Sequence, residues 1–351
     1  MRGEGGRRGW GLTRGVAAGL ACAVATITGA GGRYPAALAP APLPGRVYAP
    51  YVETWPSPDL PAISARSGAR DLTLAFLQTP HRGSCQVSWN GGSGPEAAMS
   101  HFAGEAARLA PRGGALIPSF GGYTADTRGT ELADSCPSVA RIAAGYEAAL
   151  TVYGATRLDL DVESRSLEDA TGIARRNQAI RMVEAWAQDR GRRLQVQYTL
   201  PVLPTGLAPS GLAVLASARA LGTRVDLVNI MAFDYYDGTT AMGPAAISAA
   251  TGLVRQLSRW YPRRSARRLW RMVGITLMPG IDDNPTRDEV TTLADVRQVA
   301  AFARARGIGA LSIWALQRDN GGCPHAPGRD TCSGVRQAPF AFSRLLEAYA
   351  S

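Results

Sequence analysis

Residues 157–163 read Arg-Leu-Asp-Leu-Asp-Val-Glu, and the interpretation of the whole chain starts from this stretch. Aliphatic and acidic side chains alternate strictly in it, which predicts a β-strand whose successive side chains point to opposite faces. The aliphatic face needs a core, so Asp159, Asp161 and Glu163 share the other face. Three carboxylates that are shielded from water cannot all be comfortably ionised, and such crowding is typical of catalytic sites.

Strand-like runs recur on both sides of this stretch, with helical runs between them. Such alternation indicates a parallel sheet that is covered on both faces. Eight repeats predict an α/β fold, a (β/α)8 TIM barrel over residues 46–351, as a single catalytic domain with function at the carboxyl ends of the strands. The predicted strands are 47–52, 72–78, 115–120, 158–163, 194–201, 225–235, 272–278 and 310–316, and the predicted helices include 95–111, 137–152, 168–190, 209–221, 244–260, 290–306 and 338–350.

The composition allows one large core, because 46% of the 351 residues are hydrophobic. The net charge is +10, and every basic residue apart from His is Arg. Seven Arg fall within residues 255–271. A patch for an anionic partner and a solvated helix face are both open for this run. We favour the solvated face and expect no nucleic-acid partner, because no aromatic interleaving or nucleic-acid motif accompanies the run.

The first 45 residues predict an exported chain. Residues 1–32 have a charged start, a short apolar run and small residues after it, which is the plan of a signal peptide. The apolar run is too short to span a bilayer comfortably. Twin-arginine export through Arg7 and Arg8, and a lipoprotein with Cys22 at its start, are alternatives. Residues 33–45 are rich in Pro and Ala and predict an extended spacer. We expect a secreted protein without membrane contact once the signal is removed.

Four cysteines remain outside the predicted signal. An even number in an exported chain suggests two disulfides. Cys323 and Cys332 bracket a short loop rich in Pro and Gly and are natural partners, which leaves Cys85 for Cys136. Zinc ligation is the alternative, but the spacing fits no zinc pattern.

Polar and aromatic residues follow the predicted strands toward one rim of the barrel. Ser119 and Gly121 end the third strand, and Gln197 lies on the fifth. Asp234 ends the sixth strand, and Trp314 lies on the eighth. A flat ring beside a group of carboxylates is a suitable floor for a sugar, whose C–H face stacks on aromatic rings.

Four features in this order resemble glycoside hydrolase family 18, the chitinases and endo-β-N-acetylglucosaminidases. They are Ser119-x-Gly121-Gly122, Asp159-x-Asp161-x-Glu163, Met231-x-Phe233-Asp234-Tyr235 and Trp314. The form of the sixth strand and the Thr-Arg-Leu-Asp start of the fourth are similar to a bacterial and archaeal chitinase branch. The resemblance covers residues 46–351.

The resemblance implies an endo-acting, retaining hydrolase of β-1,4 linkages between N-acetylglucosamine units, in chitin or chito-oligosaccharides. It implies that the N-acetyl oxygen of the substrate attacks the anomeric carbon while Glu163 protonates the leaving oxygen. Asp161 would orient the acetamide, and Asp159 would share a proton with Asp161. Asp234 and Tyr235 would hold the acetamide and help Glu163. The expected sugar-binding residues are Met231, Phe233, Asp234, Gln197, Trp314, Ser119 and Gly121. No metal or cofactor is implied, and we expect a monomer.

The chain departs from the family pattern at two positions. Thr156 stands where the longer motif of the fourth strand begins with another Asp. Phe233 stands where many members have a Tyr whose hydroxyl contacts the N-acetyl group. Since Phe has no hydroxyl, we expect Tyr235, two positions further along the same strand face, to take that role.

Two other functions remain open. A non-catalytic, lectin-like barrel would bind the same glycans, because a fold does not determine a function. Such proteins typically lack the terminal acid, which Glu163 supplies here. A metal-dependent hydrolase could use the clustered acids to bind Mg²⁺ or Ca²⁺. Such sites usually recruit His as well, and none of the three His lies at a predicted strand end.

Overall fold

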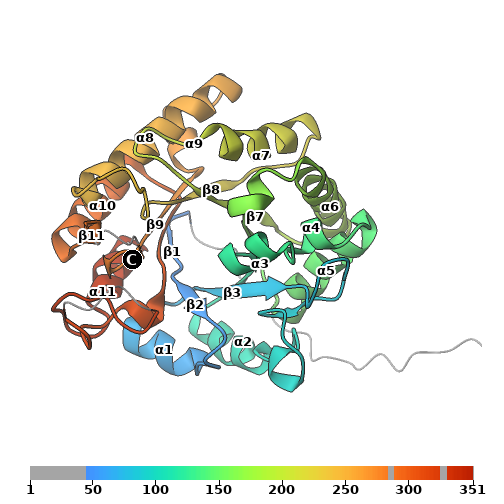
Figure 1. The fold of residues 1–351 in the computed structure, drawn as a ribbon, viewed down its shortest axis with the longest axis horizontal. Helices are drawn as coiled ribbons and strands as arrows, with labels where there is room; N and C mark the ends of the chain where they lie inside the picture. The colour runs from blue at the N-terminus through green and yellow to red at the C-terminus, as the bar shows by residue number, and fades with distance from the viewer. Residues whose placement is uncertain (1–44, 284–287, 325–329, 351) are drawn as a thin grey trace, which may run out of the picture. The chain divides into compact units, whose positions relative to one another are not determined.

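The computed structural model describes residues 45–283, 288–324 and 330–350, and in them parallel strands form a barrel inside a ring of helices (Figure 1). The predicted TIM barrel is therefore confirmed. Its first strand is interrupted at residues 49–50, which divides it into β1 (Val47–Tyr48) and β2 (Tyr51–Glu53). The other seven barrel strands are β3 (Leu72–Gln78), β5 (Leu116–Gly121), β6 (Arg157–Asp161), β7 (Gln195–Pro201), β8 (Leu227–Met231), β9 (Val273–Leu277) and β12 (Ala310–Ile313).

The sheet closes on itself through its first strand. The strand order is β1-β12-β9-β8-β7-β6-β5-β3-β2, and neighbours along this path are parallel. Because β1 pairs with the last strand and β2 with the second, the two pieces of the first strand join the ends of the sheet. The register places Asp159 beside Ser119 on β5 and beside Gln197 on β7.

The alternation in β6 has the predicted effect. Leu158, Leu160 and Val162 are fully buried and belong to the main hydrophobic core beneath the helices. The acids therefore point into the barrel interior, because successive side chains of a strand face opposite ways. A pore that is filled by side chains in layers is the usual interior of this fold.

The outer helices largely match the predicted ones, and each follows a barrel strand in the sequence. They are α2 (Ala103–Leu109), α5 (Val139–Val152), α6 (Ala170–Asp189), α7 (Pro209–Ala220), α8 (Met242–Trp260), α10 (Leu293–Arg306) and α11 (Ala341–Ala350). Ser138 caps α5 and Asp169 caps α6, each accepting hydrogen bonds from backbone N–H groups of the first turn. The helix predicted at 95–111 is shorter, because residues 95–97 form a separate 3₁₀ turn.

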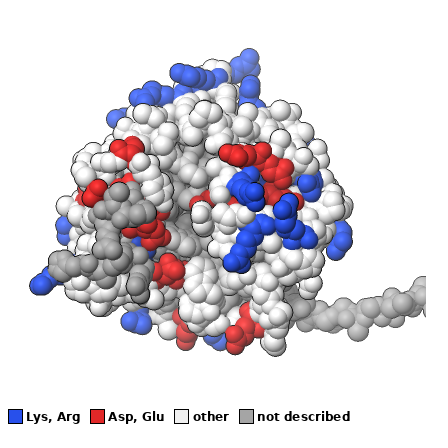
Figure 2. Space-filling view, viewed as in Figure 1, with Lys and Arg blue, Asp and Glu red and all other residues white. Residues whose placement is uncertain are grey.

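Several short elements were not predicted. Four short helices are α1 (Leu60–Ser67), α3 (Tyr123–Arg128), α4 (Leu132–Ser135) and α9 (Ala266–Trp270). The strand β4 (Ser88–Trp89) pairs antiparallel with β3. A hairpin of β10 (Gly280–Ile281) and β11 (Val290–Thr291) follows β9. The Arg-rich run 255–271 occupies the end of α8 and all of α9, and Figure 2 shows arginine side chains along that edge of the molecule.

Both predicted disulfides are present, Cys85–Cys136 and Cys323–Cys332. The predicted signal 1–32 and the spacer 33–45, except Gly45, lie outside the described residues. Within the part of the chain that the structure describes, every helix is too short or too polar to cross a membrane.

Candidate active site

A cavity of about 510 Å³ lies at the carboxyl ends of the barrel strands. Its walls come from all eight barrel strands or the segments that follow them. Carboxylates and aromatic rings dominate the lining, which consists of Tyr51, Phe76, Tyr123, Asp161, Glu163, Ser164, Thr199, Pro201, Met231, Phe233, Asp234, Tyr236, Thr276, Met278, Asp283 and Trp314. Six predicted site residues are among them, namely Asp161, Glu163, Met231, Phe233, Asp234 and Trp314.

Asp159 lies beneath the cavity and is completely buried. Four side chains donate hydrogen bonds to its carboxylate. Tyr51 (2.8 Å) and Ser119 (2.6 Å) donate to Oδ2, while Gln197 (2.8 Å) and Thr199 (2.7 Å) donate to Oδ1. Burial raises the pKa of Asp159, and the hydrogen bonds from its neighbours oppose that rise. This carboxylate is held in a fixed orientation at the base of the site.

Asp161 is bonded quite differently, although it is only two residues away. It is 4% exposed, and its Oδ1 has no hydrogen-bond partner among the described residues. Burial raises its pKa well above the ordinary value, and the nearby negative charges of Glu163, Asp159 and Asp126 raise it further. Asp161 therefore holds a proton more readily than Asp159, and its unbonded oxygen is available to a ligand in the cavity.

Glu163 lies at the mouth of the cavity, just after the end of β6. Burial raises the pKa of its side chain to about 7, a hydrogen bond from the backbone N–H of Tyr123 opposes the rise, and the charge of Asp234 adds to it. A glutamic acid with this pKa is half-protonated near neutral pH. It can therefore donate and accept a proton in turn.

A buried carboxylate that sequence analysis missed supports Glu163 from below. Asp126, on α3, is completely buried, and its Oδ2 accepts a hydrogen bond from the backbone N–H of Glu163. Burial and the charges of Glu131 and Glu163 raise the pKa of Asp126 well above its ordinary value. No motif marks this residue in the sequence, because its place depends on how α3 folds back onto the end of β6.

Aromatic rings form the floor of the cavity. Trp314 stacks on Phe76, with ring centroids 5.4 Å apart and an interplanar angle of 17°, and it meets Tyr51 edge-on at 5.7 Å. Trp55, which is 48% exposed, extends this floor, with its ring centroid 6.4 Å from that of Trp314. On the rim, Tyr123 and Tyr236 are each 65% exposed. Such rings suit a chain of sugars.

The prediction that Tyr235 lines the site is corrected by the structure. The strand was expected to continue to residue 235, but β8 ends at Met231, so the alternation of faces does not extend to Tyr235. Positive φ angles at Asp234 (50°) and Tyr236 (55°) then turn the chain. Tyr235 is buried in the hydrophobic core, and Tyr236 lines the cavity instead.

The β10–β11 hairpin holds this turn in place. Glu289 accepts hydrogen bonds from the backbone N–H groups of Tyr235 and Tyr236, both at 2.8 Å. Asp282 accepts one from the N–H of Asp234 at 3.1 Å. Both acids are buried, so the turn that carries Asp234 into the cavity is fixed by the loop after β9.

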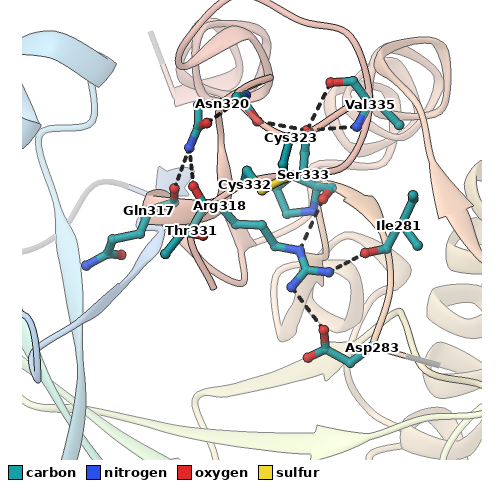
Figure 3. The surroundings of a disulfide bond; sticks show 12 residues. Ile281, Asp283, Gln317, Arg318, Asn320, Cys323, Thr331, Cys332, Ser333 and Val335 are labelled. Atoms are coloured by element: carbon teal, nitrogen blue, oxygen red, sulfur yellow. Dashed lines mark hydrogen bonds and ion pairs between the residues drawn. A yellow bond between two sulfur atoms is a disulfide. The ribbon is translucent and has the colours of Figure 1, made fainter. Parts of the chain in front are cut away.

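Arg318 connects the hairpin to the disulfide loop (Figure 3). The guanidinium is fully buried and donates to the carbonyl of Pro279 (3.2 Å), to the carbonyl of Ile281 and to the carboxylate of Asp283 (3.0 Å). The hairpin is also tied to the segment after Cys332, because Ser333 accepts a hydrogen bond from the N–H of Ile281 (2.8 Å). Asp283 reaches the cavity wall from this framework.

Glu53 ends the first barrel strand close to this framework. It is 2% exposed, and its Oε1 has no hydrogen-bond partner among the described residues. Burial raises its pKa to about 8, the charge of Asp330 raises it, and Arg318 lowers it. Its backbone exchanges hydrogen bonds with the side chain of Gln317, at 3.2 and 2.8 Å.

Three further predicted sugar contacts lie behind the cavity wall. Ser119 and Gln197 are buried and donate to Asp159, so they position a carboxylate and do not line the cavity. Gly121, with φ of 109°, accepts a hydrogen bond from Gln78 (3.2 Å). A Cβ there would lie 1.9 Å from the carbonyl oxygen of Asp161, so glycine allows β5 to approach the acidic strand.

One group of carboxylates in the described residues could hold a cation. Oxygens of Asp234, Asp282 and Glu289 lie within 4.8 Å of one another, and no His joins them. Asp282 and Glu289 already accept hydrogen bonds from the backbone of residues 234–236. Asp282 and Glu289 therefore stabilise the turn at residues 234–236.

The chain is similar to proteins that are described as chitinases, although no sequence-family model matches it. A probable bifunctional chitinase/lysozyme of Escherichia coli (strain K12) is 31% identical over 318 residues, which is 87% of this chain and 35% of the relative. Endochitinase 11 of Metarhizium anisopliae is 32% identical over 289 residues, 79% of this chain and 53% of the relative. The chain thus spans about a third and about half of the length of these two curated relatives.

A solved structure gives the same similarity over nearly its whole length. Catalytic-site mutants of active domain 2 of a thermostable chitinase from Pyrococcus furiosus, complexed with chito-oligosaccharides, are 27% identical to this chain. The TM-score is 0.77, and the match covers 89% of this chain and 97% of that domain.

Proposed function

We propose that this chain, a chitinase-like protein of glycoside hydrolase family 18, hydrolyses β-1,4 linkages between N-acetylglucosamine units of chitin or chito-oligosaccharides. One observation carries the proposal. Glu163, whose pKa is about 7, lies at the mouth of a sugar-sized cavity, and the buried acids Asp161 and Asp159 precede it on the same strand. A group that must give up and regain a proton in each turnover needs such a pKa at neutral pH.

Glu163 is the general acid in the first step and the general base in the second. It protonates the glycosidic oxygen of the leaving sugar, while the acetamide oxygen of the substrate attacks the anomeric carbon. An oxazolinium ion forms. Water, deprotonated by Glu163, then opens this ion with retention of the anomeric configuration.

Asp161 stabilises the positive charge that develops on the acetamide. Its buried carboxyl shares a proton with Asp159, and the four donors that hold Asp159 favour the state in which the proton is on Asp161. When the acetamide N–H approaches, the shared proton moves from Asp161 to Asp159, and the ionised Asp161 accepts a hydrogen bond from the N–H through its unbonded Oδ1. The low-polarity surroundings strengthen this interaction in the transition state.

The remaining wall residues bind and orient the sugar. Trp314 stacks on the sugar ring, with Phe76 and Met231 beside it. Asp234 faces Glu163 closely enough to raise its pKa and accepts a hydrogen bond from the substrate. Tyr236, in place of Tyr235, offers a hydroxyl and a ring at the rim. The relatives described as chitinases, and the domain that is complexed with chito-oligosaccharides, support this substrate class.

Product analysis tests the proposal. The purified protein is incubated with N-acetylglucosamine oligomers of two to six units, and the anomers of the new reducing ends are followed by NMR. The expected result is release of β-anomers first, from internal linkages, unaffected by EDTA. Appearance of α-anomers first would refute the substrate-assisted route. Tight binding of the oligomers without cleavage would show a lectin-like barrel.

The variant Asp161→Asn tests the assisted step. It should lower kcat about 100-fold or more, because the amide cannot carry the charge that balances the acetamide. An aryl β-glucoside lacks the acetamide that acts as the nucleophile, so neither the wild type nor the variant should hydrolyse it. Unchanged kcat on the acetylated oligomers would remove Asp161 from the mechanism.

We also propose that the protein acts outside the cell as a monomer. The two disulfides support export, because such bonds persist mainly in oxidising compartments. Size-exclusion chromatography with light scattering, and detection of the protein in culture medium, test the two parts of this proposal.

A further inference from the structure

A second hollow, of about 730 Å³, lies at the amino end of the barrel. It is formed by the last turns of α6 and α7, by the segments that lead into β7 and β8, and by the segment after α8. Residues 192–194 and 222–225 precede their strands, whereas the active-site cavity lies where strands end. A seven-residue strand is about 23 Å long, so the two hollows are separated by the depth of the barrel.

Arginines line this hollow and continue into a neighbouring one of about 460 Å³. The two share Arg192, Leu194 and Arg224 in their linings, and we call the pair the arginine cleft. Its arginines are Arg181, Arg192, Arg193, Arg219, Arg224 and Arg264.

The cleft holds an excess of positive charge. Its two carboxylates are Glu184 and Asp226, and each already pairs with an arginine, Arg181 at 3.2 Å and Arg224 at 2.9 Å. The other four arginines form no ion pair with any described carboxylate. Four uncompensated guanidinium groups that line the arginine cleft attract anions.

Two of these arginines are held in place. Arg192 lies over the ring of Trp186, 5.0 Å from its centroid, and donates to the carbonyl of Leu150 at 2.9 Å. Arg264 lies 4.2 Å from the ring centroid of Tyr261. Stacking and hydrogen bonding reduce the entropy that an arginine loses when it binds a ligand, so these groups are prepared for anions.

We propose that the arginine cleft binds one chain of an anionic polysaccharide through its carboxylate, sulfate or phosphate groups. A paired hollow of this size admits a single polymer chain, and arginine recognises such groups with two parallel hydrogen bonds. Nucleic acid is less suited, because the rings of Trp186 and Tyr261, which bases would stack on, are covered by guanidinium groups. Bound this way, the protein is retained on an acidic polymer while its other end stays open to chitin.

Binding of a fluorescent heparin octasaccharide, followed by anisotropy, tests this proposal. The double variant Arg193→Glu/Arg219→Glu should bind about 100-fold more weakly, since each reversal removes one charge-assisted contact. Both side chains are exposed and make no hydrogen bond or ion pair within the described structure, so the fold should be kept. Circular dichroism and chito-oligosaccharide hydrolysis, both expected to be unchanged, verify this.

A matched control separates the cleft from the net charge. Arg112→Glu/Arg297→Glu changes the net charge equally, at exposed arginines outside the cleft, and should bind heparin within threefold of the wild type. Equal losses of heparin affinity in the two double variants would overturn the proposal. Tighter binding of an oligothymidylate of equal charge would overturn the choice of a polysaccharide. Affinity that does not fall as salt is raised would also contradict it.

Discussion

The hollows at the two ends of the barrel are lined by opposite charges. The carboxyl end surrounds its cavity with Asp161, Glu163, Asp234 and Asp283, and no arginine or histidine is among the described residues of its lining. The amino end has the arginine cleft and a further hollow of about 630 Å³ that is lined by five arginines and no carboxylate.

The difference shows what each kind of charge can do. Carboxylates that are crowded and buried raise one another's pKa values, so they can exchange protons near neutral pH. Arginine stays protonated at any physiological pH, so an arginine-rich surface is suited to binding and not to proton transfer. The following predictions test this division between a proton-transferring end and a binding end.

Replacement of the terminal acid should have the largest effect. Glu163→Gln keeps the shape of the side chain but cannot donate a proton, so kcat should fall about 10²–10⁴-fold while oligosaccharide binding persists. Glu168→Gln, at an exposed glutamate five positions further on, is the matched control and should stay close to wild type. If both variants lost activity equally, or neither did, the acid would have to be sought elsewhere.

The buried acid of the first strand should affect stability with pH. The folded-state pKa of Glu53 is raised from 4.5 to about 8, so its contribution to stability is complete below pH 4.5 and is lost as pH rises through 8. Glu53→Gln should remove this dependence and raise the free energy of unfolding at pH 9, relative to wild type, by about 2–4 kcal/mol. Denaturant unfolding at pH 5 and pH 9 measures the difference. The prediction would be contradicted if the free energy of unfolding changed with pH equally in the wild type and in Glu53→Gln.

The pH dependence of activity should follow Glu163. Its pKa is raised to about 7, so the proton needed for the first step is present below pH 7 and is lost above it. We expect kcat/KM to fall about tenfold per pH unit on the alkaline side. A plateau that extends to pH 9 would show that the limiting acid has a higher pKa. The charge-reversal variant Arg193→Glu/Arg219→Glu should leave the midpoint of this pH dependence of kcat/KM unchanged.

The aromatic floor should contribute a smaller effect. Trp55→Ala should raise KM for hexamers about fivefold and leave that for dimers unchanged, because a stacked ring contributes about 1 kcal/mol. Trp55→Phe keeps a ring and should recover most of the loss. Equal effects on dimers and hexamers would place Trp55 at the reacting sugar and not beyond it.

Charge reversal in the arginine cleft should have the least effect on catalysis. Arg193→Glu/Arg219→Glu should keep kcat and KM on soluble oligomers within twofold, since water and ions screen charges across the depth of the barrel. A larger change would show that the two ends are coupled electrostatically. Repeating the kinetics at several salt concentrations distinguishes such coupling from a local structural effect.

Eight strand-and-helix repeats were sufficient to predict the barrel, and the alternation of residues 157–163 was sufficient to predict the inward direction of the acids. A period of two residues is a local property of the chain. The same rule failed at Tyr235, because the strand ends at Met231 and nothing local marks that end. Asp126, Glu53 and the contact between Arg318 and Asp283 were not predicted, since each depends on loop segments that are far apart in the sequence and meet only in the folded chain.

The same limit explains the roles of Ser119 and Gln197. Their strands and faces were predicted correctly, yet whether they touch the ligand or another side chain depends on depth in the barrel. Both lie one layer below the cavity and bind Asp159. Tyr51 could have been found, since it lies at the carboxyl end of the predicted first strand, 47–52.

The seam between β1 and β12 has a consequence for how the protein assembles. The hydrogen bond from Ser312 Oγ to the carbonyl of Ala49 (2.8 Å) joins residues 263 positions apart. During synthesis, this ladder is the last to become possible, and contacts of such high sequence separation form slowly. Until it forms, the sheet is open and the cavity over the acids of β6 lacks the wall that Trp314 supplies after β12. The final strand must therefore leave the ribosome before the active site around Glu163 can be completed.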